Sequence, residues 1–244
     1  MDIIFKDLIK LWGEPVDQEK IDPNVPIGFI STDTRTIKKG DFFIPLIGDK
    51  YDGHDFIEMA CDIGIQATIV SKKFLGSVPT GLPYWVVSDT LHAYQQIALL
   101  HRRNLKLPVI AVTGSVGKTT TRELIRVILS PLGEIISSKE NQNNDIGVPK
   151  TLLRGTVKDA AIVLEMGMRG LGQIERLSRI SEPDIAVITN VGQAHIGILG
   201  SRVNIAKAKS EITSNLKSDG VVIIPFGDNL LEKALREKWS GRII

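Results

Sequence analysis

The pattern of apolar positions along the chain becomes regular after Leu107. From there, short runs of apolar residues alternate with stretches in which apolar residues recur at helical spacing. The runs cover residues 109–112, 134–137, 160–164, 184–189 and 221–224. Strands that are apolar on both faces and alternate with helices are typical of a parallel sheet covered by helices on both sides. The pattern therefore predicts an α/β domain with a mostly parallel sheet over residues 107–244.

The first part of the chain has a less regular pattern. Helical spacing is found in residues 3–12, 54–63 and 89–103, and strand-like runs in residues 27–31, 41–46, 67–70 and 84–87. Pro45 lowers the expectation for the strand at 41–46, because proline removes a donor from the ladder. The mixture predicts a small α/β domain over residues 1–88, joined to the second domain by a linker helix at 89–106.

The composition limits the class of protein. Of the 244 residues, 43% are apolar and 24% are charged, and the net charge of +2 is too small to indicate binding to nucleic acid or to an anionic membrane. No apolar run approaches the roughly 20 residues of a membrane span, and the N-terminus lacks the pattern of a signal peptide. The single cysteine, Cys61, excludes an internal disulfide and fits a reducing compartment. We therefore expect a cytoplasmic monomer without nucleic-acid partners.

The most informative stretch is T-G-S-V-G-K-T-T at residues 113–120. It joins the predicted strand 109–112 to a helical pattern at 121–129, which is the layout of a phosphate-binding loop. Glycines allow backbone N–H groups to surround phosphate oxygens, and the helix N-terminus adds the positive end of its dipole. Lys118 would reach the β- and γ-phosphates, and the Thr119 hydroxyl would bind Mg²⁺. A connecting turn alone does not explain Lys-Thr-Thr at this junction, so we expect a nucleoside triphosphate to bind here.

Other polar residues follow the predicted strands, at the edge where ligands of open α/β sheets gather. Glu165 ends the run at 160–164 and is either a ligand for Mg²⁺ or a solvated acid at a strand end. His195 follows the next run and is either a ligand or an ordinary loop histidine. Asn141, Asn143 and Asn144 offer amide groups to a polar ligand, and ordinary turn chemistry explains them equally well.

A lysine occupies the apolar face of the helix predicted at residues 202–216. At about 100° per residue, Lys209 falls within roughly 60° of Ile205 and Ile212, whereas Lys207 points to nearly the opposite side. An unpaired ammonium on a buried face is costly. Two interpretations stay open: a functional buried lysine, or a lysine whose stem is buried and whose head reaches water.

Taken together, these motifs resemble those of the Mur ligases, the ATP-dependent amide-forming enzymes of peptidoglycan synthesis. They occur in the same order as in the family, from about residue 30 to residue 220. They are T-D-T-R at 32–35, Gly48 with D-G-H-D-F at 52–56, the loop at 113–120, N-x-N-N-x-x-G-V-P at 141–149, E-M-G at 165–167, T-N-V-G-x-A-H at 189–195 and A-x-A-K-x-E-I at 206–212. The run at 52–56 and the Asn-rich loop are most similar to members that join D-alanyl-D-alanine to UDP-N-acetylmuramoyl-tripeptide.

The resemblance implies that the two domains bind different substrates. The N-terminal domain would bind the UDP part of the substrate, with Thr34 and Arg35 near it, and the central domain would bind MgATP. The implied ATP contacts are Gly114, Ser115, Val116, Gly117, Lys118, Thr119 and Thr120, and the implied substrate contacts in the central domain are Asn141, Asn143 and Asn144.

The resemblance also implies a mechanism. The γ-phosphoryl group passes to the peptide carboxylate, and the amine of D-alanyl-D-alanine attacks the resulting acyl phosphate. Lys118, His195 and Lys209 would be catalytic, and the metal-site residues would be Thr119, Glu165, His195 and Lys209. In the family the lysine matching Lys209 is carbamylated, which converts a cation into a carboxylate able to face Mg²⁺.

Three departures from the family pattern stand out. Glu140 occupies a position that is usually glycine, and Pro225 replaces an asparagine in a segment that helps to hold adenine. The family also has a C-terminal domain that brings the incoming amine, and we expect it to be absent here together with the end of the central domain. The chain alone is therefore expected to be inactive. Two alternatives stay open: another Mur-type or folylpolyglutamate-type ligase, and a non-catalytic module that binds a nucleotide or UDP-sugar.

Overall fold

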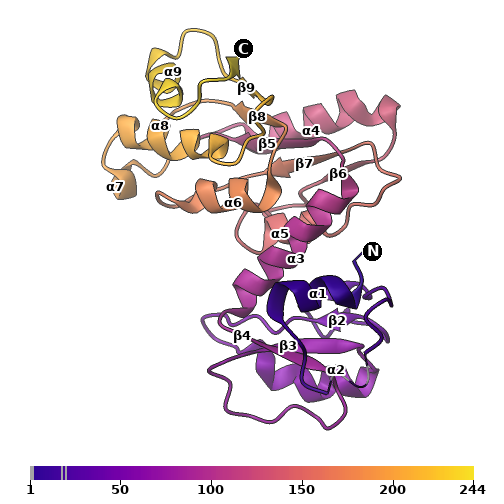
Figure 1. Ribbon diagram of the computed structural model, residues 1–244. Helices are drawn as coiled ribbons and strands as arrows, with labels where there is room; N and C mark the ends of the chain where they lie inside the picture. The colour runs from indigo at the N-terminus through magenta and orange to yellow at the C-terminus, as the bar shows by residue number, and fades with distance from the viewer. Residues whose placement is uncertain (1–2, 18, 20) are drawn as a thin grey trace. The chain divides into compact units, whose positions relative to one another are not determined.

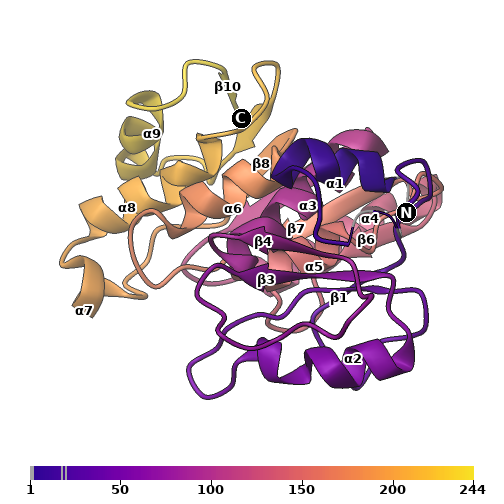
Figure 2. The same cartoon turned by 60° about the horizontal axis from the view of Figure 1, so that its bottom comes forward.

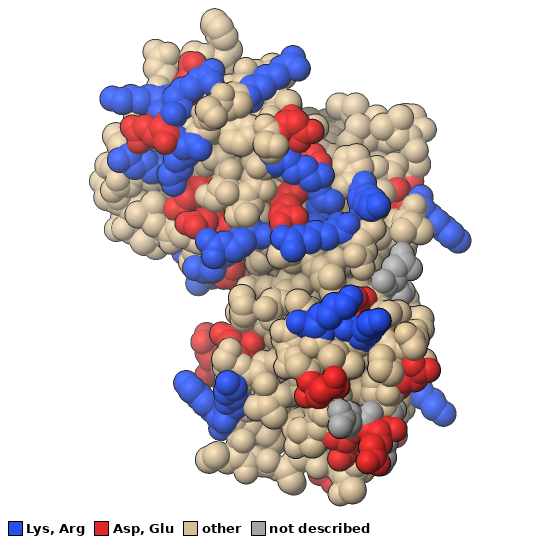
Figure 3. Space-filling view, viewed as in Figure 1, with Lys and Arg blue, Asp and Glu red and all other residues tan. Residues whose placement is uncertain are grey.

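The computed structural model describes residues 3–17, 19 and 21–244. The chain divides into two compact units, Met1–Asn104 and Leu105–Ile244. Each unit contains a parallel sheet flanked by helices, so the predicted α/β class is confirmed (Figure 1). Basic and acidic side chains are interspersed on the face shown in Figure 3, as the small net charge suggests. Among the described residues, no helix has the length and apolar character needed to cross a membrane.

The first unit has a sheet of four parallel strands in the order β1-β2-β3-β4. The strands are β1 (Ile30–Ser31), β2 (Phe42–Phe43), β3 (Ala67–Ser71) and β4 (Tyr84–Val87). The helices are α1 (Phe5–Trp12), α2 (Ile57–Ile63), which follows the 3₁₀ turn η2 (Gly53–Phe56), and α3 (Thr90–Leu105). The first two strands are shorter than expected. Pro45 lacks the N–H that a longer β2 would require.

Alternation along β2 explains the two cores of this unit, because successive side chains of a strand point to opposite faces. Phe42 packs with Trp12 of α1 and with Trp85, at ring-centroid distances of 6.5 and 5.9 Å. Phe43 instead joins the apolar cluster that contains Ile57 of α2. The helices α1 and α2 accordingly cover opposite faces of the sheet (Figure 2).

The helix expected to link the two domains packs within the first unit. Trp12 Nε1 donates a hydrogen bond of 2.9 Å to Gln96 Oε1 on α3. All but the last residue of α3 belongs to Met1–Asn104. The helix is therefore part of the first unit as well as the route to the second.

The second unit has a sheet of six parallel strands in the order β10-β9-β8-β5-β7-β6. The strands are β5 (Val109–Thr113), β6 (Ile135–Ser137), β7 (Ala161–Glu165), β8 (Ile185–Ile188), β9 (Val221–Ile223) and β10 (Arg242–Ile243). The helices are α4 (Lys118–Leu129), α5 (Gly147–Leu152), α6 (Gln173–Ser181), α7 (Ile196–Leu199), α8 (Arg202–Ser210) and α9 (Asn229–Arg236), with 3₁₀ turns η3 (Ser130–Leu132) and η4 (Glu211–Thr213).

Both faces of this sheet are covered, as the continuous apolar runs predicted. Val112 and Val163 pack under Ile125 and Leu129 of α4. The alternate residues of β5 and β7, such as Leu164, are buried as well, and α5, α6 and α8 pack together in the same unit (Figure 1).

Two predicted helices have different limits. The helix expected to begin at Thr121 begins at Lys118, because Gly117 caps it in a left-handed conformation with φ 81°. The helix expected at 202–216 is wrong in its length: α8 ends at Ser210, and a 3₁₀ turn follows. The earlier start matters for function, because it brings the positive end of α4 directly to the glycine-rich loop.

Candidate functional site

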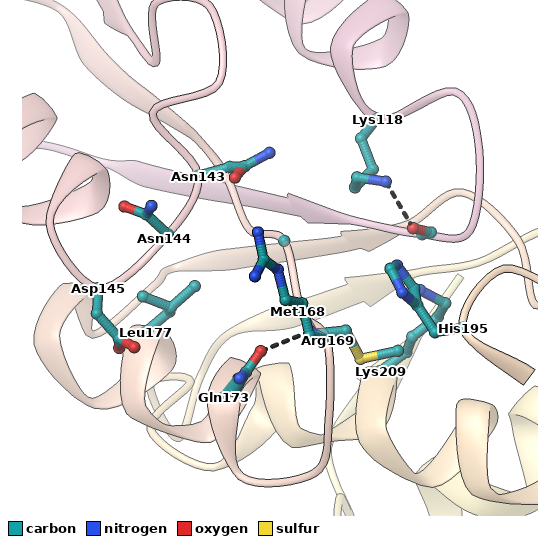
Figure 4. A pocket seen from close by; sticks show the side chains of 12 residues that line it. Lys118, Asn143, Asn144, Asp145, Met168, Arg169, Gln173, Leu177, His195 and Lys209 are labelled. Atoms are coloured by element: carbon teal, nitrogen blue, oxygen red, sulfur yellow. Dashed lines mark hydrogen bonds between the residues drawn. The ribbon is translucent and has the colours of Figure 1, made fainter. Parts of the chain in front are cut away.

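The loops that follow β5, β6, β7 and β8 leave the sheet at one edge and surround a cavity of about 460 Å³ (Figure 4). One side of the cavity is lined by Gly114, Lys118, His195 and Lys209. The other side is lined by Asn143, Asn144, Asp145, Gln173 and Leu177, with Gly167, Met168 and Arg169 between the two sides. The structure thus brings together residues predicted from five separate motifs.

The loop between β5 and α4 has the conformation of a phosphate-binding loop. Lys118 is the first residue of α4, and its Nζ donates a hydrogen bond of 3.0 Å to the carbonyl oxygen of Gly114. A Cβ atom at Gly114 would lie 1.8 Å from Thr189 Oγ1, so only glycine fits at that position. The loop therefore approaches the segment after β8 too closely for any side chain.

That segment holds the loop in shape through several hydrogen bonds, four of which involve side chains. Asn190 accepts from the backbone N–H of Val116 at 3.2 Å and donates to its carbonyl oxygen at 2.9 Å. Thr189 Oγ1 donates to the same carbonyl at 2.6 Å, and the Gly192 N–H donates to Ser115 Oγ at 2.9 Å. The sequence contained these residues in the T-N-V-G motif but gave no sign of their role, because their partners lie more than 70 positions away.

Glu165 is a buried acid with several donors, so the interpretation as a solvated strand-end residue is wrong. It is 3% exposed. Thr119 Oγ1 donates to its Oε2 at 2.8 Å, and Asn143 Nδ2 donates to its Oε1 at 2.9 Å. Arg122 pairs with it at 3.4 Å and was missed from the sequence. Its spacing of three residues after Thr119, on the same helical face, was the available signal.

The oxygen atoms of Thr119 and Glu165 fit a magnesium ion. Mg²⁺ prefers oxygen ligands and retains several waters, so one carboxylate with one hydroxyl is a sufficient protein contribution. Within the described ranges, no group of three or more His, Cys, Asp and Glu side chains is arranged to hold a metal. A protonated Lys209 cannot bind a cation, so its predicted place at a metal depends on chemical modification.

Lys209 is buried, and its head does not reach bulk water. It is 1% exposed, together with buried Ile205 and Ile212, while Lys207 is exposed as predicted. The interpretation as a lysine with a solvated head is therefore wrong. No ion pair between Lys209 and a carboxylate is found in the part of the chain that the structure describes. Burial and the charge of Lys118 lower the pKa of Lys209 to about 7, so near neutral pH much of it is a neutral amine.

His195 lies beside this lysine and caps the short helix α7 with a left-handed backbone, φ 68°. Burial lowers the pKa of His195, and the positive charges of Lys209, Lys118 and Arg169 lower it further. A neutral imidazole is favoured in this environment, and it retains a lone pair for a proton or a ligand.

The three asparagines of the loop after β6 have different surroundings. Asn143 and Asn144 line the cavity, and Asn141 is exposed outside its lining. Asn144 Oδ1 accepts the backbone N–H groups of Ile146 and Gly147 at 3.1 and 2.9 Å, which is ordinary turn chemistry. Only the side chain of Asn143 contacts another predicted site residue, Glu165.

The predicted UDP-binding residues Thr34 and Arg35 lie in the first unit, in the turn that follows β1. Arg35 has an 86% exposed side chain and pairs with Asp33 at 2.6 Å. Further along the unit, the D-G-H motif has a structural role. His54 is buried, accepts the Ser71 N–H at 2.9 Å, and so fixes the loop beside β3.

Two family profiles match the chain. The Mur ligase middle domain matches residues 112–243, and the Mur ligase family catalytic domain matches residues 26–120. The UDP-N-acetylmuramoyl-tripeptide–D-alanyl-D-alanine ligase of Synechocystis sp. is 43% identical over 91% of this chain and 48% of its own length. The ligase of the same name from Bacillus subtilis is 42% identical over 84% of this chain and 45% of its own length.

Solved structures agree with these sequence matches. MurF from Acinetobacter baumannii superimposes with a TM-score of 0.87 at 33% identity, over 99% of this chain and 52% of that one. MurF ligase from Thermotoga maritima, in complex with ADP, has a TM-score of 0.79 at 29% identity, over 89% of this chain and 50% of that one. The chain spans about half the length of the curated relatives it matches.

Proposed function

The chain belongs to the Mur ligase family, and on that premise we propose that it forms the ATP-binding and UDP-substrate-binding part of a D-alanyl-D-alanine-adding ligase. The acceptor would be UDP-N-acetylmuramoyl-tripeptide. The relatives that carry this name at 42–43% identity support the substrates. One observation carries the proposal: Lys118 of the phosphate-binding loop shares a cavity with Lys209, which is buried and has no carboxylate partner among the described residues.

The second unit would bind MgATP through the loop at 114–120. Phosphate oxygens would occupy the positive end of α4, and Lys118 would exchange the Gly114 carbonyl for the β- and γ-phosphates. The Thermotoga maritima relative is a complex with ADP, which supports an adenine nucleotide as a ligand of this chain. A magnesium ion held by Thr119 and Glu165 would neutralise part of the charge on the phosphates.

The chemistry follows from a carboxylate bound beside the terminal phosphate. An oxygen of the peptide carboxylate forms a bond to the γ-phosphorus as the bond from that phosphorus to ADP breaks. The amine of D-alanyl-D-alanine then bonds to the carbonyl carbon, inorganic phosphate leaves, and the amine loses a proton. Lys118 stabilises the charge that spreads over the transferring phosphoryl oxygens.

Lys209 would act as a carbamate. Its lowered pKa, about 7, makes the neutral amine available to attack carbon dioxide, with the amine proton released to solvent. The product is a carboxylate in a cavity that also contains Lys118 and Arg169. This charge suits the surroundings better than an ammonium does, and it would replace a cation beside His195 by an anion.

The first unit would recognise the UDP group, with Thr34 and Arg35 in the exposed turn after β1. Within the second unit, Asn143 and Asn144 would contact the peptide part, and Asn141 would do so from the rim of the loop. ATP and a UDP-linked acceptor are both cytoplasmic metabolites, which supports a cytoplasmic place for the reaction.

Calorimetry with the 244-residue chain tests the proposal. We expect Mg²⁺ with a non-hydrolysable ATP analogue to bind the wild type, and Lys118→Ala to weaken binding at least about ten-fold, or about 1.4 kcal/mol. Lys150→Ala, at an exposed lysine of α5 outside the cavity lining, is the matched control and should bind as the wild type does. Equal affinity of all three proteins for the analogue would exclude the phosphate-binding role of Lys118.

A further inference from the structure

The cavity contains one cationic side chain, that of Arg169, to which the proposed binding of ATP and Mg²⁺ gives no role. We propose that Arg169 binds the carboxylate of the peptide substrate that accepts the phosphoryl group, and so selects substrates that carry it. This inference rests on the proposed function and adds a specificity-determining residue to it. No motif singles out Arg169, because it follows E-M-G without belonging to it.

The segment that carries Arg169 is held in place. The Arg169 N–H donates to Gln173 Oε1 at 2.5 Å, and the Gly167 N–H donates to the carbonyl of Asn143 at 2.8 Å. The buried carboxylate of Glu211 accepts the Gly172 N–H at 2.8 Å. A loop fixed on both sides of Arg169 holds the backbone of this exposed residue at a defined place, which reduces the backbone entropy lost when a ligand binds.

The guanidinium of Arg169 differs from those of its neighbours. Arg176 and Arg179 on α6 pair with carboxylates at 2.9 and 2.8 Å, and buried Arg122 pairs with Glu165. For the Arg169 guanidinium, the described residues supply neither an ion pair nor a hydrogen bond. It nevertheless lines a cavity that already contains two lysines. Lys118 is assigned to the nucleotide phosphates, and Lys209 is largely neutral near pH 7. The Arg169 guanidinium is therefore the positive charge of the cavity that is left for a second anion.

The position of Arg169 favours a carboxylate over the nucleotide phosphates. The phosphate-binding loop follows β5, whereas Arg169 follows β7, which lies between β5 and β6. In Figure 4 the guanidinium extends toward the side of Asn143 and Leu177, away from Lys118. An acceptor must lie next to the terminal phosphate, and the planar fork of arginine matches the two oxygens of a carboxylate. This side also carries amide groups, one apolar side chain and the carboxylate of Asp145, which pairs with Arg176 at 2.9 Å. Such a mixed lining suits a peptide.

Calorimetry with three ligands tests whether the anion that Arg169 binds is the peptide carboxylate or a nucleotide phosphate. The ligands are a non-hydrolysable ATP analogue with Mg²⁺, UDP-N-acetylmuramoyl-tripeptide, and the same tripeptide with its C-terminal carboxylate converted to an amide. With the ATP analogue present, Arg169→Gln should weaken binding of the tripeptide about ten-fold, as expected for a lost charged hydrogen-bond pair. Binding of the ATP analogue itself should change less than about two-fold, and the amide should bind equally to both proteins.

Arg179→Gln is the matched control, because Arg179 is an exposed arginine of α6 outside the cavity lining. Arg169→Lys should recover part of the lost affinity for the tripeptide. Unchanged binding of the tripeptide by Arg169→Gln would overturn the inference, and so would an equal loss for the ATP analogue, which would make Arg169 a phosphate contact. A wild-type chain that binds neither ligand would instead overturn the proposed function, and this inference with it.

Discussion

Replacement of Lys209 by methionine should make the ligand-free chain more stable at pH 7. Methionine keeps most of the volume of the buried lysine stem. It removes an amine from a residue that is 1% exposed and lacks a carboxylate partner in the described structure. Replacing a buried ion pair by apolar residues of similar volume is often neutral or stabilising by about 1–4 kcal/mol, and a buried amine without a partner has the desolvation cost without the attraction. We expect a gain within that range.

The magnitude follows from the lowered pKa of Lys209, about 7 against an ordinary value of 10.5. The difference of about 3.5 units corresponds to about 5 kcal/mol at most, at about 1.4 kcal/mol per unit. Between pH 7 and pH 10.5 the unfolded chain holds a proton that the folded chain lacks, so the stability of the wild type rises with pH across this window. Below pH 7 the folded chain must also hold the proton, so the full free-energy cost of burying the charged ammonium lowers its stability.

Equilibrium urea unfolding in carbon-dioxide-free buffer, at pH 7 and pH 9, provides the assay. The advantage of Lys209→Met over the wild type should shrink by about 2 kcal/mol between the two pH values, since only the wild type gains from losing the proton. Lys207→Met changes an exposed lysine of the same helix and should stay within about 0.5 kcal/mol of the wild type at both. A constant difference between Lys209→Met and the wild type would refute the reasoning, as would a large destabilisation at pH 7.

Three further changes test other parts of the structure. Gly114→Ala should destabilise the second unit by about 1–3 kcal/mol in thermal or urea unfolding, because its Cβ would clash with Thr189 Oγ1; adding Thr189→Ala should restore part of the loss. His54→Leu should cost the first unit about 1–3 kcal/mol, because it leaves the Ser71 N–H buried without its acceptor; stability equal to the wild type would contradict this. Arg35→Ala should weaken UDP-N-acetylmuramoyl-tripeptide in calorimetry and leave the ATP analogue unaffected, and the opposite result would reverse the roles of the two units.

Much of the second unit could be predicted because its signals are local. Continuous apolar runs separated by helical spacing require a sheet that is covered on both faces, and the observed sheet is parallel throughout. The spacing of Lys209 from Ile205 and Ile212 placed it on the buried face even though the helix ends early at Ser210. The predicted burial of a residue depends only on which side of one or two helical turns faces the protein interior. The prediction for Lys209 is therefore correct although the predicted helix was too long.

The sequence by itself also determined the glycine-rich loop, because the loop needs only one strand, two glycines and the start of one helix, all within a dozen residues. The tertiary structure decided which groups support it. Asn190 hydrogen-bonds to Val116, and Arg122 pairs with Glu165. Arg169 lines the same cavity as the loop after β5, because it follows β7, which is the neighbour of β5 in the sheet. These contacts join segments that are tens of residues apart, and no local pattern of apolar and polar positions encodes which distant loop will lie beside another.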